Sequence, residues 1–465
     1  MTWGNLTAKS SNLVVLIPIV LRTFSKEDVV IWYLYFTVVS LQLLIDFGFL
    51  PTFSRLFSYA YSGLNINQIK DIRNNKIADG IVNRESIDRL YFATRTVYLW
   101  LAIVSCLLAV SFGSYMVYEP MNRSTHPTSA WGGWLAVIII ASFNLYANSL
   151  VAFLQGINRI ALVQRWQMVT SFLAVVSSAC TVYLTHSLCF GILAYYIWQI
   201  INYFINMYLL KKEYTFGHSV SDSNEVRDIV YNIIWPTAWR SGFGVMMSMG
   251  LIQLSGMVVA KIETAAQAAS YMLALQIVRT ASSFSQAPFY SRLPYYTQLY
   301  SQNLIKELIA NSMEGMKKSY YVFIFFFFSI GILAQPLLSI LGSKSDFVSL
   351  DLWVLICFGF LVERFGAMYL QLYTLTNVII WHIANGITGL LMIIFSFVLQ
   401  NTIGIYAFPV SMLASYLVFF APYVIRKTYK EFNISFIKNE SGTFLQAVLI
   451  FCIVSSIMFI VQRWL

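Results

Sequence analysis

Charged residues are scarce in this sequence. Asp, Glu, Lys and Arg make up only 11% of its 465 residues, whereas they make up about a quarter of a typical soluble domain. Hydrophobic residues reach 58% and aromatic residues 17%. This composition excludes a soluble enzyme held by a single membrane anchor, and it predicts an integral membrane protein.

Cysteine and histidine are few and dispersed. The five cysteines lie in or beside apolar stretches without any C-x-x-C pair, and the four histidines are scattered along the chain. Disulfide frameworks and metal centres need such residues at short, recurring spacings. We therefore expect packed or lipid-facing cysteines, no metal site, no catalytic triad and no enzymatic activity.

A nucleotide-binding motif is also missing. The phosphate-binding pattern G-x-x-x-x-G-K-[ST] does not occur, and the predicted loops do not exceed about 40 residues. ATP is therefore not expected to drive this protein directly. We expect no cofactor, which leaves coupling to H⁺ or Na⁺ as the source of energy to consider.

Long apolar runs are what the sequence has in abundance. A membrane-spanning helix needs roughly 20 apolar residues, and thirteen runs come near this length. The sequence thus predicts an all-α polytopic membrane protein with twelve helices and a thirteenth at the C-terminal end. The runs are 5–22, 29–50, 90–117, 131–155, 160–184, 188–210, 236–260, 265–288, 318–342, 350–374, 378–399, 404–425 and 443–462.

Lysine and arginine are distributed unevenly between the loops. The loops after even-numbered runs carry nineteen of them, and the alternate loops carry five. Because cationic loops stay in the cytoplasm, the N-terminus and the larger loops are predicted to be cytoplasmic. The net charge of +10 then follows from topology, with anionic membrane lipids rather than nucleic acid as the expected partner.

A short motif occurs twice in the chain. PTFSRL begins at Pro51 and PFYSRL begins at Pro288. Three further pairs of segments match in the same order, among them the segments around Asn144 and Glu363. Four matches in register predict a duplicated unit of six helices, whose two copies are parallel. Some transporters of this layout place the substrate between two halves that move around it.

The repeat predicts two pseudo-symmetric six-helix lobes around a central cavity. An extra helix after two even-numbered repeats would place the C-terminus outside. The predicted parts are an N-terminal lobe at 1–212, a cytoplasmic linker at 213–235, a C-terminal lobe at 236–430, and a cytoplasmic segment with the extra helix at 431–465.

The repeated motif is expected at the cytoplasmic end of the second helix of each lobe. Pro51 and Pro288 lack a backbone donor, so each is expected to end or kink a helix. Arg55 and Arg292 follow one turn later, where a long cationic side chain reaches the head groups. These residues form either a hinge with a cationic anchor or a ring at the cytoplasmic mouth that meets an anionic substrate.

A few polar and ionisable residues fall inside the predicted helices. Such groups are costly in a bilayer, so they usually face a cavity or a partner. The cations are expected to bind a phosphate-bearing substrate, and the carboxylates to bind H⁺ or accompany Na⁺. The alternative is a set of interhelical ion pairs that hold the lobes together. The candidates are Lys9, Asp46, Asn144, Asn148, Arg240, Arg279, Glu363 and Arg364.

The first sixty residues carry a family resemblance. The stretch VLRTFSKEDVVIWYLYFTVVSLQLLIDFGFLPTFSRLFSYA from Val20 resembles the start of bacterial polysaccharide transporters. These are the O-antigen and capsule repeat-unit flippases of the multidrug/oligosaccharidyl-lipid/polysaccharide exporter superfamily. In that family the first helix commonly ends in an arginine like Arg22. The second helix ends in Asp-x-Gly, here from Asp46, before a Ser-Arg exit like the one that ends at Arg55.

The resemblance implies a job and a place. The implied job is to move an undecaprenyl-diphosphate-linked oligosaccharide from the inner to the outer leaflet of the bacterial cytoplasmic (inner) membrane by alternating access. The implied partners are a polysaccharide polymerase and the chain-length machinery. The thirteenth helix departs from the twelve-helix members of the family. The implied contacts to the diphosphate and sugars are Lys9, Arg22, Asn144, Asn148, Arg240, Arg279 and Arg364.

Two other functions compete with this one. A cation-coupled multidrug antiporter of the same superfamily shares the architecture and the need for buried carboxylates. A membrane glycan polymerase or glycosyltransferase would instead use an acidic pair such as Glu27 and Asp28 in the first outer loop. The short outer loops argue against such an enzyme, because it generally needs a long loop or a domain to hold the acceptor.

Overall fold

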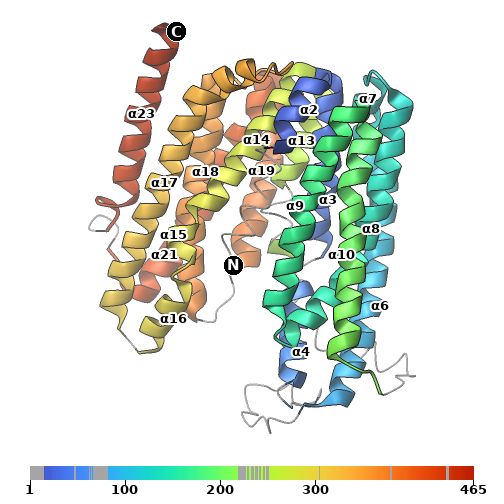
Figure 1. Cartoon of the computed structure of the whole chain (residues 1–465). Helices are drawn as coiled ribbons and strands as arrows, with labels where there is room; N and C mark the ends of the chain where they lie inside the picture. The colour runs from blue at the N-terminus through green and yellow to red at the C-terminus, as the bar shows by residue number, and fades with distance from the viewer. Residues whose placement is uncertain are drawn as a thin grey trace. The chain divides into compact units, whose positions relative to one another are not determined.

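The computed structural model describes most of the chain (Figure 1). The described residues are 15–46, 49–61, 82–217, 251–302, 304–376, 380–435 and 439–464, with a few single residues between these ranges. All regular secondary structure within them is helical, which confirms the all-α class. The chain divides into two compact units, Met1–Gln253 and Leu254–Leu465, called here the N-unit and the C-unit. The predicted lobe and linker boundaries remain predictions.

The N-unit contains long helices joined by short turns. One continuous helical stretch runs over Arg84–Asn122 and includes a π-helical turn, η2, at Ala109–Gly113. Pro127 occupies the first turn of α8, where the missing backbone donor costs nothing. The helices are α2 (Ile17–Thr23), α3 (Lys26–Ile45), α4 (Phe49–Tyr61), α6 (Arg84–Leu108), α7 (Ser114–Asn122), α8 (Pro127–Gly156), α9 (Ile160–Thr185) and α10 (Leu188–Glu213).

The C-unit combines long helices with several short ones. Helix α14 opens with a capping box, in which the side chains of Thr264 and Gln267 each bond the other's backbone amide. Gly404, at φ +53°, lies where α19 turns back toward α20, a conformation that glycine adopts without strain. The helices are α13 (Leu251–Ile262), α14 (Ala265–Ser285), α15 (Ala287–Tyr290), α16 (Leu293–Ser301), α17 (Ile305–Ile340), α18 (Leu350–Tyr373), α19 (Trp381–Ile403), α20 (Ala407–Ser415), α21 (Ala421–Phe432) and α23 (Phe444–Trp464).

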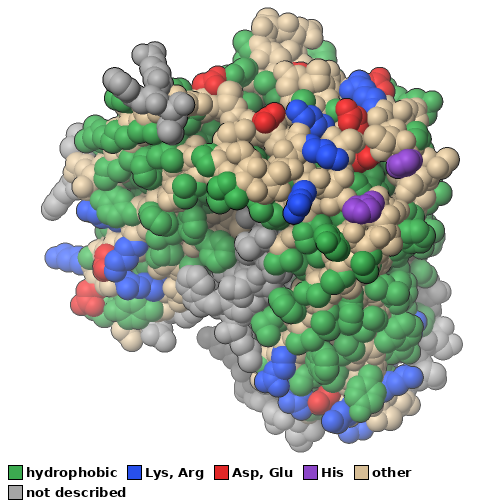
Figure 2. Space-filling view, turned by 45° about the horizontal axis from the view of Figure 1, so that its top comes forward, with side chains coloured by type: hydrophobic (Ala, Val, Ile, Leu, Met, Phe, Trp, Pro, Cys, Tyr) green, Lys and Arg blue, Asp and Glu red, His purple; other side chains and the backbone are tan. Residues whose placement is uncertain are grey.

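The surface of the described chain is that of a membrane protein. Eight helical stretches are long and apolar enough to cross a bilayer, so the chain is a multi-pass membrane protein. Large apolar side chains such as Leu107 in α6, Ile139 in α8 and Phe397 in α19 are exposed. Figure 2 shows broad hydrophobic areas with the charged side chains gathered in a few clusters between them.

One helix in each unit is central. In α8 and in the span that contains α18, 72% of the most apolar 18-residue stretch is buried, whereas the other candidate spans reach only 22–33%. Helix α8 contacts α3, α4, α6 and α10, and α18 contacts α14, α17, α20 and α21. These two helices carry the segments around Asn144 and Glu363 that matched in the sequence repeat. The fourth helix of each predicted half is therefore the one around which its unit packs.

The first copy of the repeated motif packs closely on α8. Helix α3 ends at Ile45 and α4 begins at Phe49, so one helix ends and the next begins just before the motif. A Cβ atom on Gly156 of α8 would lie 2.3 Å from Cβ of Phe57 and 2.9 Å from the carbonyl oxygen of Ser54. Only a residue without a side chain permits this crossing, as is common where membrane helices touch.

The thirteenth apolar run forms helix α23 in the C-unit. The ring of Phe444 stacks on Phe365 of α18 with centroids 3.8 Å apart. Just before this helix, the buried carboxyl of Glu440 accepts hydrogen bonds from Tyr369 of α18 and, at 2.5 Å, from Tyr429 of α21. The extra helix is thus joined to the C-unit by apolar packing and by a buried carboxylate whose oxygens are hydrogen-bonded.

Candidate functional site

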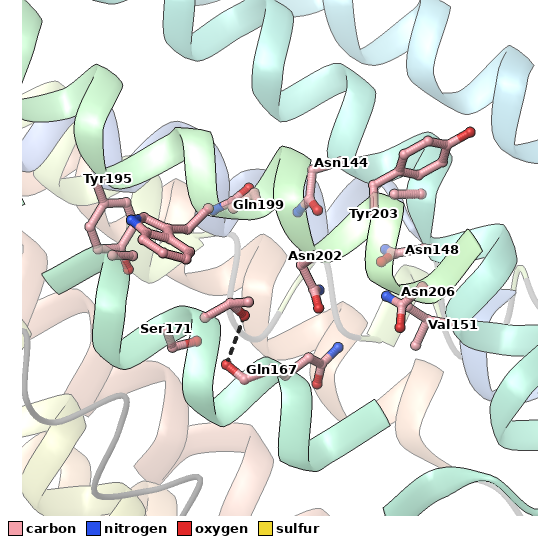
Figure 3. A pocket seen from close by; sticks show the side chains of 14 residues that line it. Asn144, Asn148, Val151, Gln167, Ser171, Tyr195, Gln199, Asn202, Tyr203 and Asn206 are labelled. Carbon is pink, nitrogen blue, oxygen red and sulfur yellow. Dashed lines mark hydrogen bonds between the residues drawn. The ribbon is translucent and has the colours of Figure 1, made fainter. Parts of the chain in front are cut away.

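A polar cavity of about 240 Å³ lies between α8, α9 and α10 of the N-unit. We call it the amide pocket, because six of its lining side chains are amides and none of the described residues that line it is charged. Figure 3 shows Asn202 of α10 pointing across this space toward Gln167 of α9. The amides are Asn144, Asn148, Gln167, Gln199, Asn202 and Asn206.

Helical spacing explains why these side chains meet. Residues three or four apart lie on one face of a helix. Asn144 and Asn148 are four apart on α8, and Gln199, Asn202 and Asn206 follow at three and four on α10. Each helix thus presents a polar stripe to the same space. Such a stripe would be energetically costly if it faced lipid.

Three of the amides have unused hydrogen-bonding capacity. The side-chain oxygens of Gln199, Asn202 and Asn206 are buried and have no hydrogen-bond partner in the structure. Asn206 as a whole is only 1% exposed. Buried polar atoms in proteins are nearly always hydrogen-bonded. Three oxygens that lack a partner among the described residues, all on side chains that line one cavity, therefore single out this cavity as a candidate site.

The aromatic part of the pocket is fixed in orientation. The indole Nε1 of Trp198 donates to Oγ of Ser177 at 2.9 Å, and Ser177 donates to the carbonyl oxygen of Ala194 at 3.1 Å. The only donor of Trp198 is therefore satisfied by the protein. Tyr203, which also lines the pocket, packs edge-on against Phe143 with centroids 4.8 Å apart.

A buried carboxyl group lies beside the pocket. Asp46, in the turn after α3, is 7% exposed. It accepts hydrogen bonds from the hydroxyl of Tyr98 at 2.7 Å and from the backbone amide of Leu50 at 3.2 Å. The side chain of Asn148 hydrogen-bonds the same carboxyl. The structure thus brings together Asp46, Asn144 and Asn148, which the sequence had singled out separately.

In the C-unit, Arg364 joins two helices. It is 1% exposed, and its Nη2 donates to the carbonyl oxygen of Ser282 on α14 at 3.1 Å and also to the Ser282 hydroxyl. With the amide of Gln286 turned so that its oxygen faces the guanidinium, that oxygen lies 2.7 and 2.9 Å from the two Nη atoms. Glu363 lies 3.9 Å away. Arg364 thus links α18 to the end of α14 by hydrogen bonds, while both the interhelical ion pairs and a contact to substrate stay predictions.

Arg279 on α14 is different. It is partly buried, and its guanidinium has no hydrogen-bond or ion-pair partner among the described residues. Gln276, Ser283 and Gln286 lie three, four and seven residues away and are likewise not buried, so they extend the same face of α14. This face of α14 is therefore polar, and the Arg279 guanidinium on it has no counter-ion among the described residues.

The remaining predicted residues lie apart from these two places. Arg22 is exposed at the end of α2, and Arg55 is exposed in α4. Arg292 directly precedes α16, and its side chain lies 3.8 Å from the carboxylate of Glu314 in α17. Pro288 lies in α15. Pro51 lies in the first turn of α4. Lys9 and Arg240 lie outside the described residues.

One member of the acidic pair considered for an enzyme is buried and hydrogen-bonded. Asp28 is 4% exposed and accepts hydrogen bonds from the hydroxyls of Ser124 at 2.6 Å and Thr125 at 2.5 Å. These bonds fasten the start of α3 to the loop before α8. Within the described ranges, no group of three or more His, Cys, Asp or Glu residues gathers into a metal site.

Sequence reasoning missed the α10 side of the pocket. The pattern Y-x-x-W-Q-x-x-N-Y-x-x-N from Tyr195 to Asn206 repeats polar and aromatic residues every three or four positions in an otherwise apolar helix. That spacing indicates a polar face directed away from lipid. A search for uncharged stripes, as well as for charges, would have found it.

Comparisons with known proteins place the fold. No protein-family model matches the chain, and no curated protein matches it. A multidrug resistance MATE family transporter of the MOP superfamily, solved in an inward-facing conformation, is similar with a TM-score of 0.63 at 12% identity, over 91% of this chain and 94% of that one. The lipid II flippase MurJ in an inward closed conformation is similar with a TM-score of 0.61 at 11% identity, over 99% of both chains. The chain thus has the all-α fold of these transporters.

Proposed function

We propose that this protein is a flippase that moves an undecaprenyl-diphosphate-linked oligosaccharide across the bacterial cytoplasmic membrane. The observation that carries the proposal is Arg279, a partly buried guanidinium without a described counter-ion. An arginine inside a membrane helix almost always pairs or faces water. Its planar fork suits the oxygens of a phosphate better than any other side chain does.

The charge balance of the C-unit supports an anionic substrate. Glu363 lies 3.9 Å from the buried Arg364, so these two residues compensate each other. Arg279 then remains as the net charge of the α14 face. A binding surface for organic cations would be expected to carry the opposite sign.

Asp46 is the proposed ion-coupling group. It is a buried carboxyl that accepts hydrogen bonds from Tyr98 and Leu50. When ionised, it can only accept hydrogen bonds, whereas its protonated form can also donate one. Proton or Na⁺ binding at this position would link ion movement to alternating access. A polymerase and the chain-length machinery are proposed to receive the exported repeat unit.

A multidrug antiporter is the second candidate. The similar MATE family structure is that of a multidrug resistance transporter, and the buried carboxyl of Asp46 suits cation-coupled export as well as it suits glycan export. The two functions differ in what they require of Arg279. A cationic drug gains nothing from a guanidinium at that place, whereas a diphosphate gains a charge-assisted hydrogen bond.

The leaflet distribution of the lipid-linked repeat unit tests the proposal. The gene is deleted in its native host, and the repeat unit is assayed in each leaflet with and without a plasmid copy. We expect the unit to accumulate in the inner leaflet of the deletion strain and to reappear outside on complementation. Normal translocation in the deletion strain, together with altered efflux of cationic dyes, contradicts the flippase and favours the antiporter.

A further inference from the structure

We infer that the amide pocket of the N-unit binds one uncharged sugar ring of the transported glycan. This inference rests on the proposed function and adds to it the part of the substrate that the N-unit recognises. The starting observation is that Gln199, Asn202 and Asn206 line one cavity, and that the buried side-chain oxygen of each has no hydrogen-bond partner among the described residues.

Amides match the hydrogen-bonding needs of sugar hydroxyls. Each hydroxyl is both a donor and an acceptor, and each amide side chain offers two donors and an acceptor oxygen. Six amides from three helices, with Thr170 and Ser171 between them on α9, surround a ring on several sides. Thr170 also donates to the carbonyl oxygen of Gln167 at 3.2 Å, which leaves its lone pairs for a ligand.

The lack of charge argues for a sugar rather than a diphosphate or a drug cation. None of the described lining residues is ionisable apart from two tyrosines. A diphosphate placed here would lose its hydration without gaining a cation. A cationic drug would likewise lack a carboxylate, because the nearest one, Asp46, already accepts bonds from Tyr98, Leu50 and Asn148.

The size of the cavity fits a single ring. An apolar cavity of about 150 Å³ is known to admit benzene, and the amide pocket has about 240 Å³. The additional volume accommodates the hydroxyl groups of one six-membered ring. We therefore assign the pocket to one residue of the glycan and not to the whole repeat unit.

The aromatic side chains complete the recognition. Trp198 has its Nε1–H occupied by Ser177, so what it offers the pocket is the apolar surface of its indole ring. Sugar rings have apolar C–H faces as well as hydroxyl edges, and an aromatic face covers the former while the amides bind the latter. Pockets that combine apolar walls with a few placed polar groups are the usual form of small-molecule sites.

Binding to two matched lipids tests the assignment. The full-length protein in lipid nanodiscs is titrated with lipid-linked oligosaccharide extracted from the native host, and with undecaprenyl diphosphate that carries no sugar. The test variant is Gln199→Leu with Asn202→Leu, which replaces two amides by apolar side chains and removes two of the three unpartnered oxygens. The control is Gln400→Leu, a partly buried glutamine in α19 of the C-unit.

We expect the double variant to bind the oligosaccharide lipid at least about tenfold more weakly, since two hydrogen bonds are lost. Its affinity for undecaprenyl diphosphate should be unchanged, and the control should match the wild type for both lipids. If the double variant does not fold, Asn202→Leu alone carries the same comparison with a smaller loss.

Other outcomes separate the two proposals. Wild-type protein that binds neither lipid contradicts the proposed function. Binding of the oligosaccharide lipid that the variants retain in full, or an equal loss for both lipids, contradicts only the sugar assignment. Loss of Na⁺ binding in the double variant, with glycolipid binding intact, overturns the inference in favour of a cation site.

Discussion

The hydroxyl of Tyr98 on α6 donates a hydrogen bond of 2.7 Å to the carboxyl of Asp46. Tyr98 is 0% and Asp46 is 7% exposed, so water does not compete strongly for this bond. Asn148 bonds the same carboxyl and lines the amide pocket. Gain or loss of a proton at Asp46 would therefore change the hydrogen bond between Asp46 and Asn148, and with it the side-chain groups of Asn148 that remain for a ligand in the pocket.

Replacing Asp46 with Asn should uncouple transport from its ion gradient. The amide keeps the shape of the carboxyl and can still accept from Tyr98, but it cannot titrate. We expect flipping in proteoliposomes to lose its response to imposed H⁺ and Na⁺ gradients, while glycolipid binding persists. Tyr98→Phe is the companion variant and should keep the response, because the carboxyl remains. A gradient response that survives in the Asp46→Asn protein removes Asp46 from the coupling mechanism.

Replacing Arg279 with Gln should impair substrate binding without unfolding the protein. Loss of one charge-assisted hydrogen bond predicts roughly tenfold or greater weakening, measured as binding of undecaprenyl diphosphate in nanodiscs. The matched control is Arg123→Gln, because Arg123 is an exposed arginine whose ion pair with Glu119 is exposed as well. Unchanged lipid affinity of the Arg279 variant would remove the main support for an anionic substrate.

Replacing Arg364 with Met should chiefly destabilise the C-unit. The change removes the donors to the Ser282 hydroxyl and to the Gln286 amide oxygen, and each buried group left unpaired costs about 1–3 kcal/mol. The midpoint of heat unfolding in detergent is expected to fall clearly, whereas Arg292→Met should change it little because an exposed ion pair contributes about 0–1 kcal/mol. A normal midpoint with lost lipid binding would instead support Arg364 as a substrate ligand.

Two glycines of α8 offer a test of the packing. Gly156→Ala places a Cβ 2.3 Å from Phe57 and against the backbone of Ser54, whereas Gly132→Ala meets only Sγ of Cys189 at 3.6 Å. Overpacking of this kind typically costs about 1–3 kcal/mol. We expect the unfolding midpoint to fall for Gly156→Ala and to stay near the wild type for Gly132→Ala. Equal midpoints would show that α4 does not pack closely on α8.

The helical fold could be predicted from the sequence because it depends on composition and run length. The apolar runs indicated the helices of the described residues, while most of the runs 5–22 and 236–260 lies outside them. The pairing of the segments around Asn144 and Glu363 pointed to the two most buried of the eight candidate spans. Helix breaks were harder to place. Helices α3 and α14 end at Ile45 and Ser285, before the prolines are reached. Pro51 and Pro288 instead fit the first turn of the helix that follows.

The candidate site was predicted only in part. Asp46, Asn144 and Asn148 stood out as polar residues in apolar helices, and the structure brings them together. The α10 amides were missed because uncharged stripes raise no signal in a search for charges. For Arg364, the residues around it in sequence could not reveal Ser282 on another helix as its partner, since such contacts depend on how the helices pack.

The most direct test of the central claim is a transport assay on one preparation with two substrates. Purified protein in proteoliposomes is given the native lipid-linked oligosaccharide in one experiment and a cationic dye in another, with Arg279→Gln protein in parallel. The account predicts that wild-type protein flips the glycolipid, that Arg279→Gln flips it at least about tenfold more slowly, and that neither moves the dye. Dye transport by both proteins without movement of the glycolipid would contradict the account.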